Sequence, residues 1–447
     1  MRLAVPQRID NVACTVCGCV CDDLRITVEG ERVVGAEGAC HLAEPWYLSQ
    51  GDRQPPAAEM EGEPVARDTA LDRAADILRA ARAPLIYGLS RSNTEGQQAA
   101  IALADRLGAI IDTTASLGHA PAILALQEAG ESTCSLGEVK NRADLVLFWG
   151  SNPVESHPRH FERYSVDPVG EFLPGGRNDR TVVVVDVRPT TSSERADVFL
   201  QVEPGRDFEV LWTLRGLVRG QQPAPEAVVG APLDALRELA QRMKNCRCGI
   251  VFFGLGLSRA HLGHRSVEAL LRLVTDLNAF TRFYARRMRV SSDVAGADSV
   301  LAWQTGYPFS VSLSRGYPRF NPGEFTAHDL LRRGEVDACL LVGSFGVRRF
   351  SPDAIANLKS IPTIVLDPPT MESLTPPTVR FTTAIPGVHL PGTAYRMDEI
   401  PIPLRALLPA HYPSDADVLQ AIGARIGVGR EWPRKSTDAR MPCKSCR

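Results

Sequence analysis

The pattern of apolar and polar residues in this 447-residue chain changes character near residue 68. Between residues 23 and 40 apolar and polar residues alternate around a Glu-Gly turn, whereas beyond residue 68 continuous apolar runs alternate with longer amphipathic stretches. Alternation with a period of two is typical of a β-hairpin, and continuous apolar runs separated by helices are typical of parallel sheets covered on both faces. The sequence therefore predicts an N-terminal β-hairpin followed by an α/β region.

The same pattern assigns individual elements. We expect amphipathic helices at residues 70–82, 94–108 and 267–280, the second of them ending at Gly108. Buried strands are expected at the apolar runs 84–89, 109–114, 143–150, 181–187, 248–253, 336–343 and 361–367. Several of these strands lead into polar loops, and ligands of such folds bind at the carboxyl ends of the strands.

A Pro-rich stretch at residues 219–236 divides the α/β region, so we expect two doubly wound parallel-sheet domains. The predicted organisation is a cysteine-rich module (1–55), a first α/β domain (56–220), a second α/β domain (221–370), a segment that returns to the core (371–425) and a tail (426–447).

Composition narrows the classes of function. The formal net charge is −2, so no surplus of cations is available to bind nucleic acid or an anionic membrane. No apolar run has the length of a membrane span, and the N-terminal stretch MRLAVPQRID lacks the apolar run of a signal peptide. We therefore expect a cytoplasmic protein with mostly reduced cysteines and with neither nucleic acid nor membrane as its partner.

Four cysteines lie within the stretch CTVCGCVC, and a fifth follows the predicted hairpin. Cys14, Cys17, Cys21 and Cys40 have the spacing C-x2-C-x3-C, then eighteen residues, then C. Zinc and a [4Fe–4S] cluster both accept four thiolates, and three close cysteines with one distant cysteine favour the iron–sulfur cluster. The alternative is a motif that persists only as part of the fold. In either case Cys19 is left over.

Other candidate features are less specific. Cys443 and Cys446 form a C-x-x-C in the tail, which is a metal, redox or assembly handle or has no role. The stretch GLGLS (254–258) is interpreted as a tight turn after a strand, and the histidines of SHPRH (156–160) as part of a loop that contacts a ligand or partner. The run RFYARRMR (282–289) is either a solvated basic face or a site for an anion or partner.

Several of these stretches occur together in one known superfamily. The cysteine-rich start, GSNPVESHPRH and VVVVDVRPTTSSERAD with VEPGRDFE behind it resemble the molybdopterin oxidoreductases. Within that superfamily, WQTGYPFSVSLSRGYPRFNPGE and GTAYRMDEIPIPL are similar to the B subunit of formylmethanofuran dehydrogenase, and the resemblance covers about residues 10–425. It implies the fold of the molybdopterin oxidoreductases, with the N-terminal cysteines as ligands of a [4Fe–4S] cluster.

The resemblance also implies where further cofactors lie in redox-active members. These members hold a tungsten or molybdenum ion on two pterin guanine dinucleotides and reduce carbon dioxide to formate, which a second subunit condenses with methanofuran. Residues of this chain that match the pterin loops are Gly150, Ser151, Asn152, Asp186 and Arg188.

One position departs from the family pattern. The family has a cysteine or selenocysteine, which ligates the metal, directly before a histidine, but here Gly118 precedes His119. Glycine has no side chain and cannot ligate. His119 and Arg289, the arginine at the position that looks catalytic, would then have no metal to assist. We therefore expect no catalytic residues on this chain and no tungsten or molybdenum pterin.

A member without the metal ligand most resembles the B subunit of the bacterial formyltransferase/hydrolase complex, which acts in formaldehyde oxidation. That complex converts formyl-tetrahydromethanopterin to formate through a methanofuran-like carrier. The resemblance implies a non-redox assembly subunit whose partners are amidohydrolase-like, formyltransferase-like and small pterin-cap-like subunits, with the [4Fe–4S] cluster either loaded or lost.

Two alternatives remain. One is an active tungsten or molybdenum formylmethanofuran or formate dehydrogenase whose metal is held without protein sulfur. The other is a stand-alone redox sensor that uses the N-terminal cysteines together with the tail C-x-x-C, which leaves the two α/β domains unexplained.

Overall fold

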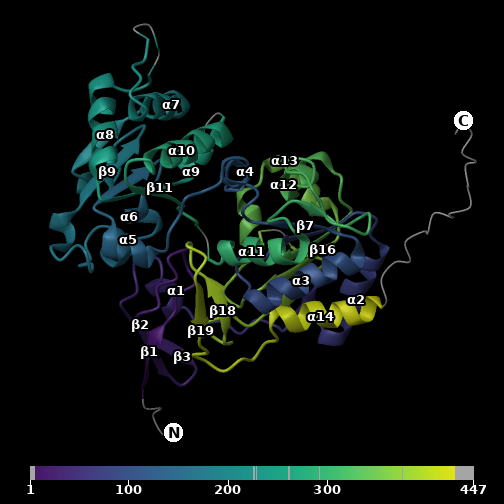
Figure 1. Cartoon of the computed structure of the whole chain (residues 1–447). Helices are drawn as coiled ribbons and strands as arrows, with labels where there is room; N and C mark the ends of the chain where they lie inside the picture. Colours follow the sequence, from purple (N-terminus) through teal and green to yellow (C-terminus); the bar gives the residue numbers. More distant parts are fainter. Residues whose placement is uncertain are drawn as a thin grey trace, which may run out of the picture.

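The computed structural model describes residues 6–427 except 225, 226, 228, 260, 261, 291 and 375. Two α/β lobes and a small N-terminal module make up the described part (Figure 1). A five-stranded sheet with its helices forms the teal lobe, and a nine-stranded sheet forms the larger lobe beside it. The N-terminal module, drawn in purple, lies next to the β18–β19 hairpin.

The nine-stranded sheet has the order β14-β13-β7-β6-β15-β16-β17-β4-β5. Its central strands, from β7 to β17 in this order, are parallel, and antiparallel strands flank them. In chain order the strands are β4 (Ala58–Met60), β5 (Glu63–Pro64), β6 (Pro84–Gly88), β7 (Ile110–Thr113), β13 (Val311–Ser312), β14 (Arg319–Phe320), β15 (Ala338–Val342), β16 (Thr363–Asp367) and β17 (Val379–Thr382).

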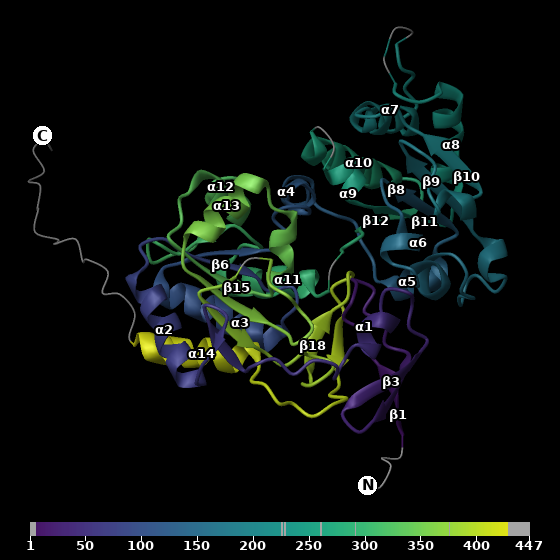
Figure 2. The same cartoon turned by 180° about the vertical axis from the view of Figure 1, so that it is seen from behind.

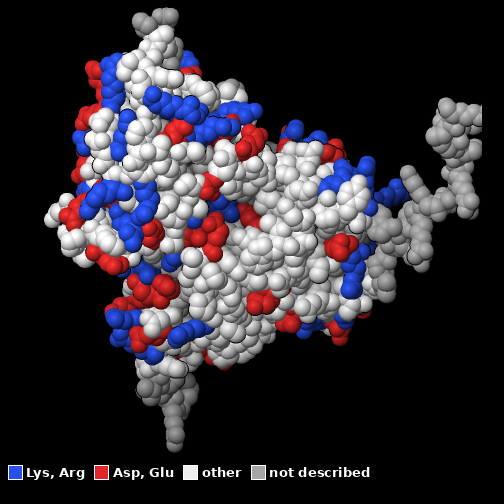
Figure 3. Space-filling model, viewed as in Figure 1, with Lys and Arg blue, Asp and Glu red and all other residues white. Residues whose placement is uncertain are grey.

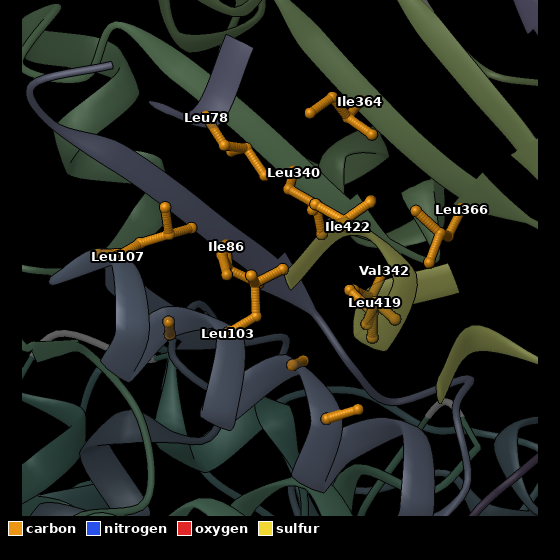
Figure 4. Close-up of a cluster of buried hydrophobic side chains, with 14 of the residues drawn as sticks. Leu78, Ile86, Leu103, Leu107, Leu340, Val342, Ile364, Leu366, Leu419 and Ile422 are labelled. Atoms are coloured by element: carbon orange, nitrogen blue, oxygen red, sulfur yellow. The ribbon is translucent and has the colours of Figure 1, made fainter. Parts of the chain in front are cut away.

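Helices cover both faces of this sheet, as Figure 2 shows from behind. One face packs against α2 (Arg67–Ala80), α3 (Thr94–Leu107), α11 (Val294–Thr305) and α14 (Asp415–Ile426), and the other against α12 (Ala327–Arg333) and α13 (Pro352–Ser360). Figure 4 shows the first of these cores, in which Leu103 of α3 and Leu419 of α14 meet Ile86 and Leu340 of the sheet. Its members are almost fully buried, and burying each such aliphatic side chain contributes about 1.5–3 kcal/mol.

The five-stranded sheet is parallel throughout and has the order β10-β9-β8-β11-β12. Its strands are β8 (Leu145–Trp149), β9 (Thr181–Asp186), β10 (Val198–Gln201), β11 (Cys248–Phe253) and β12 (Arg282–Arg287). One face packs against α4 (Ala120–Ala129), α7 (Asp207–Val218), α8 (Leu233–Asn245) and α10 (Gly263–Leu277). The other face shares a core with the N-terminal module, where Val12 and Leu24 pack with Phe148.

The N-terminal module is a three-stranded antiparallel sheet with a short helix. Strands β1 (Gln7–Val12), β2 (Leu24–Glu29) and β3 (Arg32–Glu37) pair in that order, and α1 (Glu44–Leu48) follows. The β2–β3 connection turns at Gly30, whose φ of 62° suits glycine. The remaining elements are α5 (Leu136–Arg142), α6 (Pro153–Ser156), η1 (Phe161–Ser165), η2 (Gly176–Asp179), η3 (Ser193–Arg195), α9 (Leu255–Ser258), η4 (Ser344–Arg349), β18 (Gly392–Tyr395) and β19 (Pro401–Leu404).

The helices and buried strands predicted from the sequence are confirmed within a few residues, and Gly108 caps α3 in the left-handed conformation. Strand membership, however, does not follow the predicted break at residue 220. The nine-stranded sheet takes strands from both 58–113 and 311–382, with the five-stranded sheet inserted between them. The Pro-rich stretch connects α7 to α8, which pack on the same face of the five-stranded sheet. Apolar periodicity shows that a strand is buried but not which strand pairs with it.

Within the described part of the chain, no helix is long and apolar enough to span a membrane.

Candidate functional site

The N-terminal cysteines surround one small pocket. Residues on both sides of the hairpin line it, together with Pro158 and Arg159 from the loop after α6. The cysteines of its lining are Cys14, Cys17, Cys19, Cys21 and Cys40. A hydrogen bond from the Cys14 backbone N–H to the Cys21 carbonyl (2.8 Å) closes the loop that carries the first four.

Charges near this pocket favour a thiolate. A hydrogen bond from the Cys19 thiol lowers the pKa of Cys21 to about 7, and the nearby charges of Arg163 and Arg159 act in the same direction. Burial instead raises the pKa of Cys14 well above its usual range. Both arginines are held by ion pairs to the carboxylate of Asp23, each at 2.7 Å.

The donor set can be compared with the two predicted kinds of metal site. Among the described residues, no group of three or more His, Cys, Asp or Glu side chains is placed to hold a single metal ion. Four thiols spread around a pocket, with cations beside it, fit a larger anionic group such as an iron–sulfur cluster better than they fit zinc. Assignment of a [4Fe–4S] cluster to Cys14, Cys17, Cys21 and Cys40 remains a prediction.

A second candidate region lies where the carboxyl ends of the two parallel sheets approach each other. The loop after β7 carries Gly118 and His119, and His119 directly precedes α4. The hydroxyl of Ser258, from α9 of the five-stranded lobe, donates to the Gly118 carbonyl at 3.1 Å. This contact connects the loop of one sheet to the strand end of the other.

His119 is buried, and its Nε2 has no hydrogen-bond partner. Burial lowers the pKa of His119 well below its usual range, and the charges of Arg289, Arg287, Arg349 and Arg259 lower it further. The imidazole is therefore neutral in a strongly cationic environment, which is suited to an anionic ligand.

The predicted position of the missing ligand is enclosed. A Cβ atom at Gly118 would lie 3.2 Å from Leu255 Cδ2 and 3.3 Å from Arg259 Nη2. Arg259 makes no ion pair with any residue in the described ranges. Its guanidinium thus occupies the space beside Gly118.

The basic run at 282–289 is not a solvated face. It forms β12 and the two residues after it, and Arg286, Arg287 and Arg289 are buried. Arg289 pairs with the carboxylate of Asp298, yet its Nε and Nη1 have no partner. Arg287 pairs with Glu131 at 3.2 Å. These arginines face inward because the strand ends at the junction of the two lobes.

The matched pterin-loop residues lie at neighbouring strand ends, as parallel pairing requires. Gly150, Ser151 and Asn152 follow β8, whereas Asp186 ends β9 and Arg188 is exposed just beyond it. Asn152 accepts from the Ser192 hydroxyl at 2.6 Å, which joins its loop to the one after β9. Ser151 is buried, and its hydroxyl has no partner.

The histidines of SHPRH are core residues and do not line a loop surface. His157 and His160 are both buried, and burial lowers the pKa of His157 to about 4. His160 Nδ1 shares a hydrogen bond with Ser165 Oγ at 2.9 Å. The two histidine rings pack inside the five-stranded lobe, whereas Pro158 and Arg159 of the same loop line the cysteine pocket. That this loop contacts a ligand or partner stays a prediction.

Sequence reasoning missed a third cavity, at the carboxyl ends of β6, β15, β16 and β17. Its polar lining includes Ser92, Arg91, Asp293 and Asp415, and the cysteine-module residues Thr15 and Trp46 close it. Partners are lacking for Arg91 Nε, Ser92 Oγ and Asp415 Oδ1, all of them buried. The polar stretch SRSN follows the strand at 84–88 and could have indicated this cavity. It matches no known motif, so it was not singled out.

The tail cysteines Cys443 and Cys446 lie outside the described residues.

Comparison with known proteins identifies the family. The B subunit of tungsten-containing formylmethanofuran dehydrogenase 2 from Methanocaldococcus jannaschii is 40% identical over 433 residues, covering 94% of this chain and 98% of that protein. This chain belongs to the family of formylmethanofuran dehydrogenase B subunits. The corresponding protein from Methanococcus maripaludis is 39% identical over 93% of the chain and 98% of its own length. No family model matches the sequence.

More distant relatives include a component of a different complex. The B subunit of the formyltransferase/hydrolase complex from Methylorubrum extorquens is 27% identical over 66% of this chain and 76% of that subunit. A solved structure of that complex with methylofuran aligns with a TM-score of 0.70 and 25% identity, covering 83% of this chain and 98% of the matched chain. Acetylene hydratase from Pelobacter acetylenicus shares the fold, with a TM-score of 0.64 at 11% identity over 93% of this chain and 69% of that one.

The family and the solved complex establish two points about this protein. It has the mixed α/β architecture with parallel sheets of these relatives, and its relatives are subunits of hetero-oligomeric complexes.

Proposed function

We propose that this chain is a non-redox assembly subunit of a complex that transfers a formyl group to a methanofuran-like carrier and releases it as formate. The observation that carries the proposal is Gly118 with Arg259 beside it. Position 118 offers no side chain that could ligate a metal, and the Arg259 guanidinium lies 3.3 Å from where a Cβ atom at that position would be.

The proposed cofactor content follows from the same residues. Pterin-bound tungsten or molybdenum supplies electron transfer when it is present in the relatives' fold. In this chain the unpartnered donors of His119 and Arg289 fit an anion, but the ligand position does not fit the metal. We therefore propose that the chain carries no tungsten or molybdenum pterin, and that the pterin-loop residues and the pair His119 and Arg289 are remnants of that site.

The proposed partners and location follow from the resemblance. Catalysis would belong to amidohydrolase-like and formyltransferase-like subunits, with a small pterin-cap-like subunit completing the fold, in the cytoplasm. The solved four-subunit relative supports the assignment to a hetero-oligomer.

A second candidate function is favoured by a specific observation. Identity to the tungsten-containing dehydrogenase subunits (40% and 39%) exceeds that to the formyltransferase/hydrolase subunit (27%), and the cysteine set of the cluster is complete. Buried nitrogen atoms of His119 and Arg289 lack partners at the junction of the two sheets. An active dehydrogenase whose metal has no protein ligand is thus the alternative.

Metal analysis distinguishes the non-redox assembly subunit from the active dehydrogenase. In the complex purified anaerobically with its partner subunits, we expect no tungsten or molybdenum and no viologen-linked formate oxidation. His119→Ala and Arg289→Ala should leave formyl transfer and hydrolysis unchanged, and Gly118→Cys should not create redox activity. Near-stoichiometric tungsten or molybdenum, or a redox turnover abolished by either alanine variant, would replace the proposal with the dehydrogenase.

A further inference from the structure

Among the described residues that line the cysteine pocket, Arg159 carries the one charged side chain. Cysteines and apolar residues make up the rest of the lining. Arg159 belongs to the SHPRH loop, where it lies between two buried histidines. The ring of His157 bonds the Arg289 carbonyl at 2.7 Å, and the ring of His160 bonds Ser165 Oγ at 2.9 Å. Because both rings are anchored in the lobe, the loop presents Arg159 to the pocket in a fixed place.

The guanidinium of Arg159 is also held by its own contacts. Its Nη1 and Nη2 donate to the two carboxylate oxygens of Asp23 at 2.7 and 2.8 Å, and its Nε donates to Glu162 at 2.5 Å. Asp23 follows the four close cysteines, and Gly38 precedes the distant one. A Cβ atom at Gly38 would lie 4.0 Å from Arg159 Nη1. Arg159 therefore lies beside both chain segments that carry the predicted cluster ligands.

The carboxylates that hold Arg159 do not cancel its charge at the pocket. The side chains of Arg159 and Arg163 are 14% and 17% exposed, whereas the two carboxylates bonded to Arg159 are 43% and 55% exposed. Acidic and basic side chains lie together at the surface where the five-stranded lobe meets the N-terminal module (Figure 3). Water screens these exposed carboxylates more than it screens a buried guanidinium. An adjacent thiol has the largest effect on the pKa of Cys21, and the charges of both arginines lower it as well, so both act on that sulfur.

We propose that Arg159, with Arg163 beside it, raises the reduction potential of the iron–sulfur cluster predicted in the cysteine pocket. One-electron reduction adds one negative charge to the cluster and its thiolates, and a nearby cation stabilises the more negative state. This role rests on the predicted [4Fe–4S] cluster and is independent of the Gly118 region. It also identifies what the SHPRH loop contacts, namely the group that the cysteines hold.

The test is a potentiometric titration of the complex containing the whole chain, purified anaerobically and reduced stepwise with dithionite. Electron paramagnetic resonance follows the reduced cluster, and the signal that Cys17→Ala abolishes is assigned to the cysteine pocket. At the wild-type midpoint potential, Arg159→Gln should lower the ratio of reduced to oxidised cluster by about threefold or more, because a buried positive charge is lost. Arg159→Lys keeps the charge and should restore most of that ratio. The matched control is Arg237→Gln, which alters an exposed arginine paired with Asp234 on α8, across the five-stranded sheet from the pocket, and should leave the ratio unchanged.

Iron content of the same samples separates a shifted potential from a lost cluster. Should Arg159→Gln release the iron, Arg163→Gln decides the outcome, because its charge acts on the same thiolate. An unchanged or higher potential in the iron-loaded variant that decides would overturn the proposal, and so would an equal shift in Arg237→Gln. Wild-type complex without iron, or with zinc in its place, would overturn the cluster prediction and this proposal together, whereas an unshifted potential leaves the cluster prediction standing.

Discussion

His157 illustrates how one buried side chain can couple stability to pH. Its Nε2 lies 2.7 Å from the Arg289 carbonyl, which can only accept, so Nε2 carries a proton, and Nδ1 lies 2.9 Å from the Ser156 hydroxyl oxygen. Burial lowers the pKa of His157 to about 4, so the ring is neutral near pH 7. The histidine links the SHPRH loop to Arg289, two residues beyond the end of β12.

The lowered pKa of His157 can be tested by measuring the free energy of unfolding as a function of pH. Between pH 6.5 and 4 the unfolded chain binds a proton at residue 157 that the folded chain does not, so stability falls as the pH falls through this window. We expect wild type to lose about 3 kcal/mol relative to His157→Gln across it. Asp112 and Asp293, whose pKa burial raises to about 7, act in the opposite direction, but they are common to both proteins and cancel in the difference. Parallel pH profiles of the two proteins would contradict the assignment.

Cysteine substitutions test the proposed cluster at the same scale. Cys17→Ala should lose iron from anaerobically purified protein and loosen the N-terminal module, because the energy of metal binding is also folding energy. Cys19→Ala is the matched control. Cys19 lines the same pocket but lies outside the predicted ligand set, so iron should be retained. Iron and visible absorbance are the measurements, and colourless wild-type protein without iron or zinc would make the motif a remnant.

At the residue scale, the sequence identified only those candidate site residues that belong to a recognisable motif. Gly118 was visible because a histidine follows it. Arg259 was not, because its position beside Gly118 depends on how α9 meets the loop of another sheet. The run at 282–289 was ambiguous for a related reason: a series of arginines is the same whether they are solvated or buried at a junction.

The ends of β8 and β11 meet in close backbone contact. A Cβ atom at Gly254 would lie 2.5 Å from the Gly150 carbonyl oxygen and 2.8 Å from Ser151 Cβ. These contacts involve backbone or Cβ atoms, which cannot move without shifting a strand. Gly254 has φ −115° and ψ −167°, so glycine is required there by space alone.

Two glycine-to-alanine variants give a matched pair. We expect Gly254→Ala to lower the free energy of unfolding by about 3 kcal/mol, because it forces two strand ends apart. Gly118→Ala should stay within about 1 kcal/mol of wild type, since the tight contacts there are ends of the Leu255 and Arg259 side chains, which can rotate. Denaturant titration measures both. Equal effects would mean that the β8–β11 junction can relax.

Single elements were predictable because each has a local cause. Asn93 caps α3 by accepting from the Gly96 N–H, and Gly108 ends that helix. Sheet order was not predictable, because β6 pairs with β15, a strand that follows it in the chain only after the whole five-stranded lobe, and no local pattern encodes that choice. The short antiparallel strands β13 and β14 were missed since two residues give no periodicity.

At the scale of the whole molecule, the insertion of one lobe into the other predicts which fragments fold. The core between the five-stranded sheet and its helices draws its buried residues from 122–285 alone. We therefore expect a fragment of residues 114–290 to unfold cooperatively, with reduced stability because its second face normally packs on the N-terminal module. A fragment of residues 56–220 holds parts of both sheets and should not. Circular dichroism during denaturation is the measurement, and the reverse order would contradict the division.

The same insertion has a consequence for the order of events during synthesis. All five strands of the inserted lobe have emerged from the ribosome soon after residue 287 has been made, while β4 to β7 of the other lobe still await β15, β16 and β17. The cysteine pocket is lined only by residues 14–43 and the pair 158–159, so it is complete earlier still. Domains generally fold as units during synthesis. If the predicted cluster is present, its insertion can therefore precede the synthesis of β18 and β19, whose residues pack against that module.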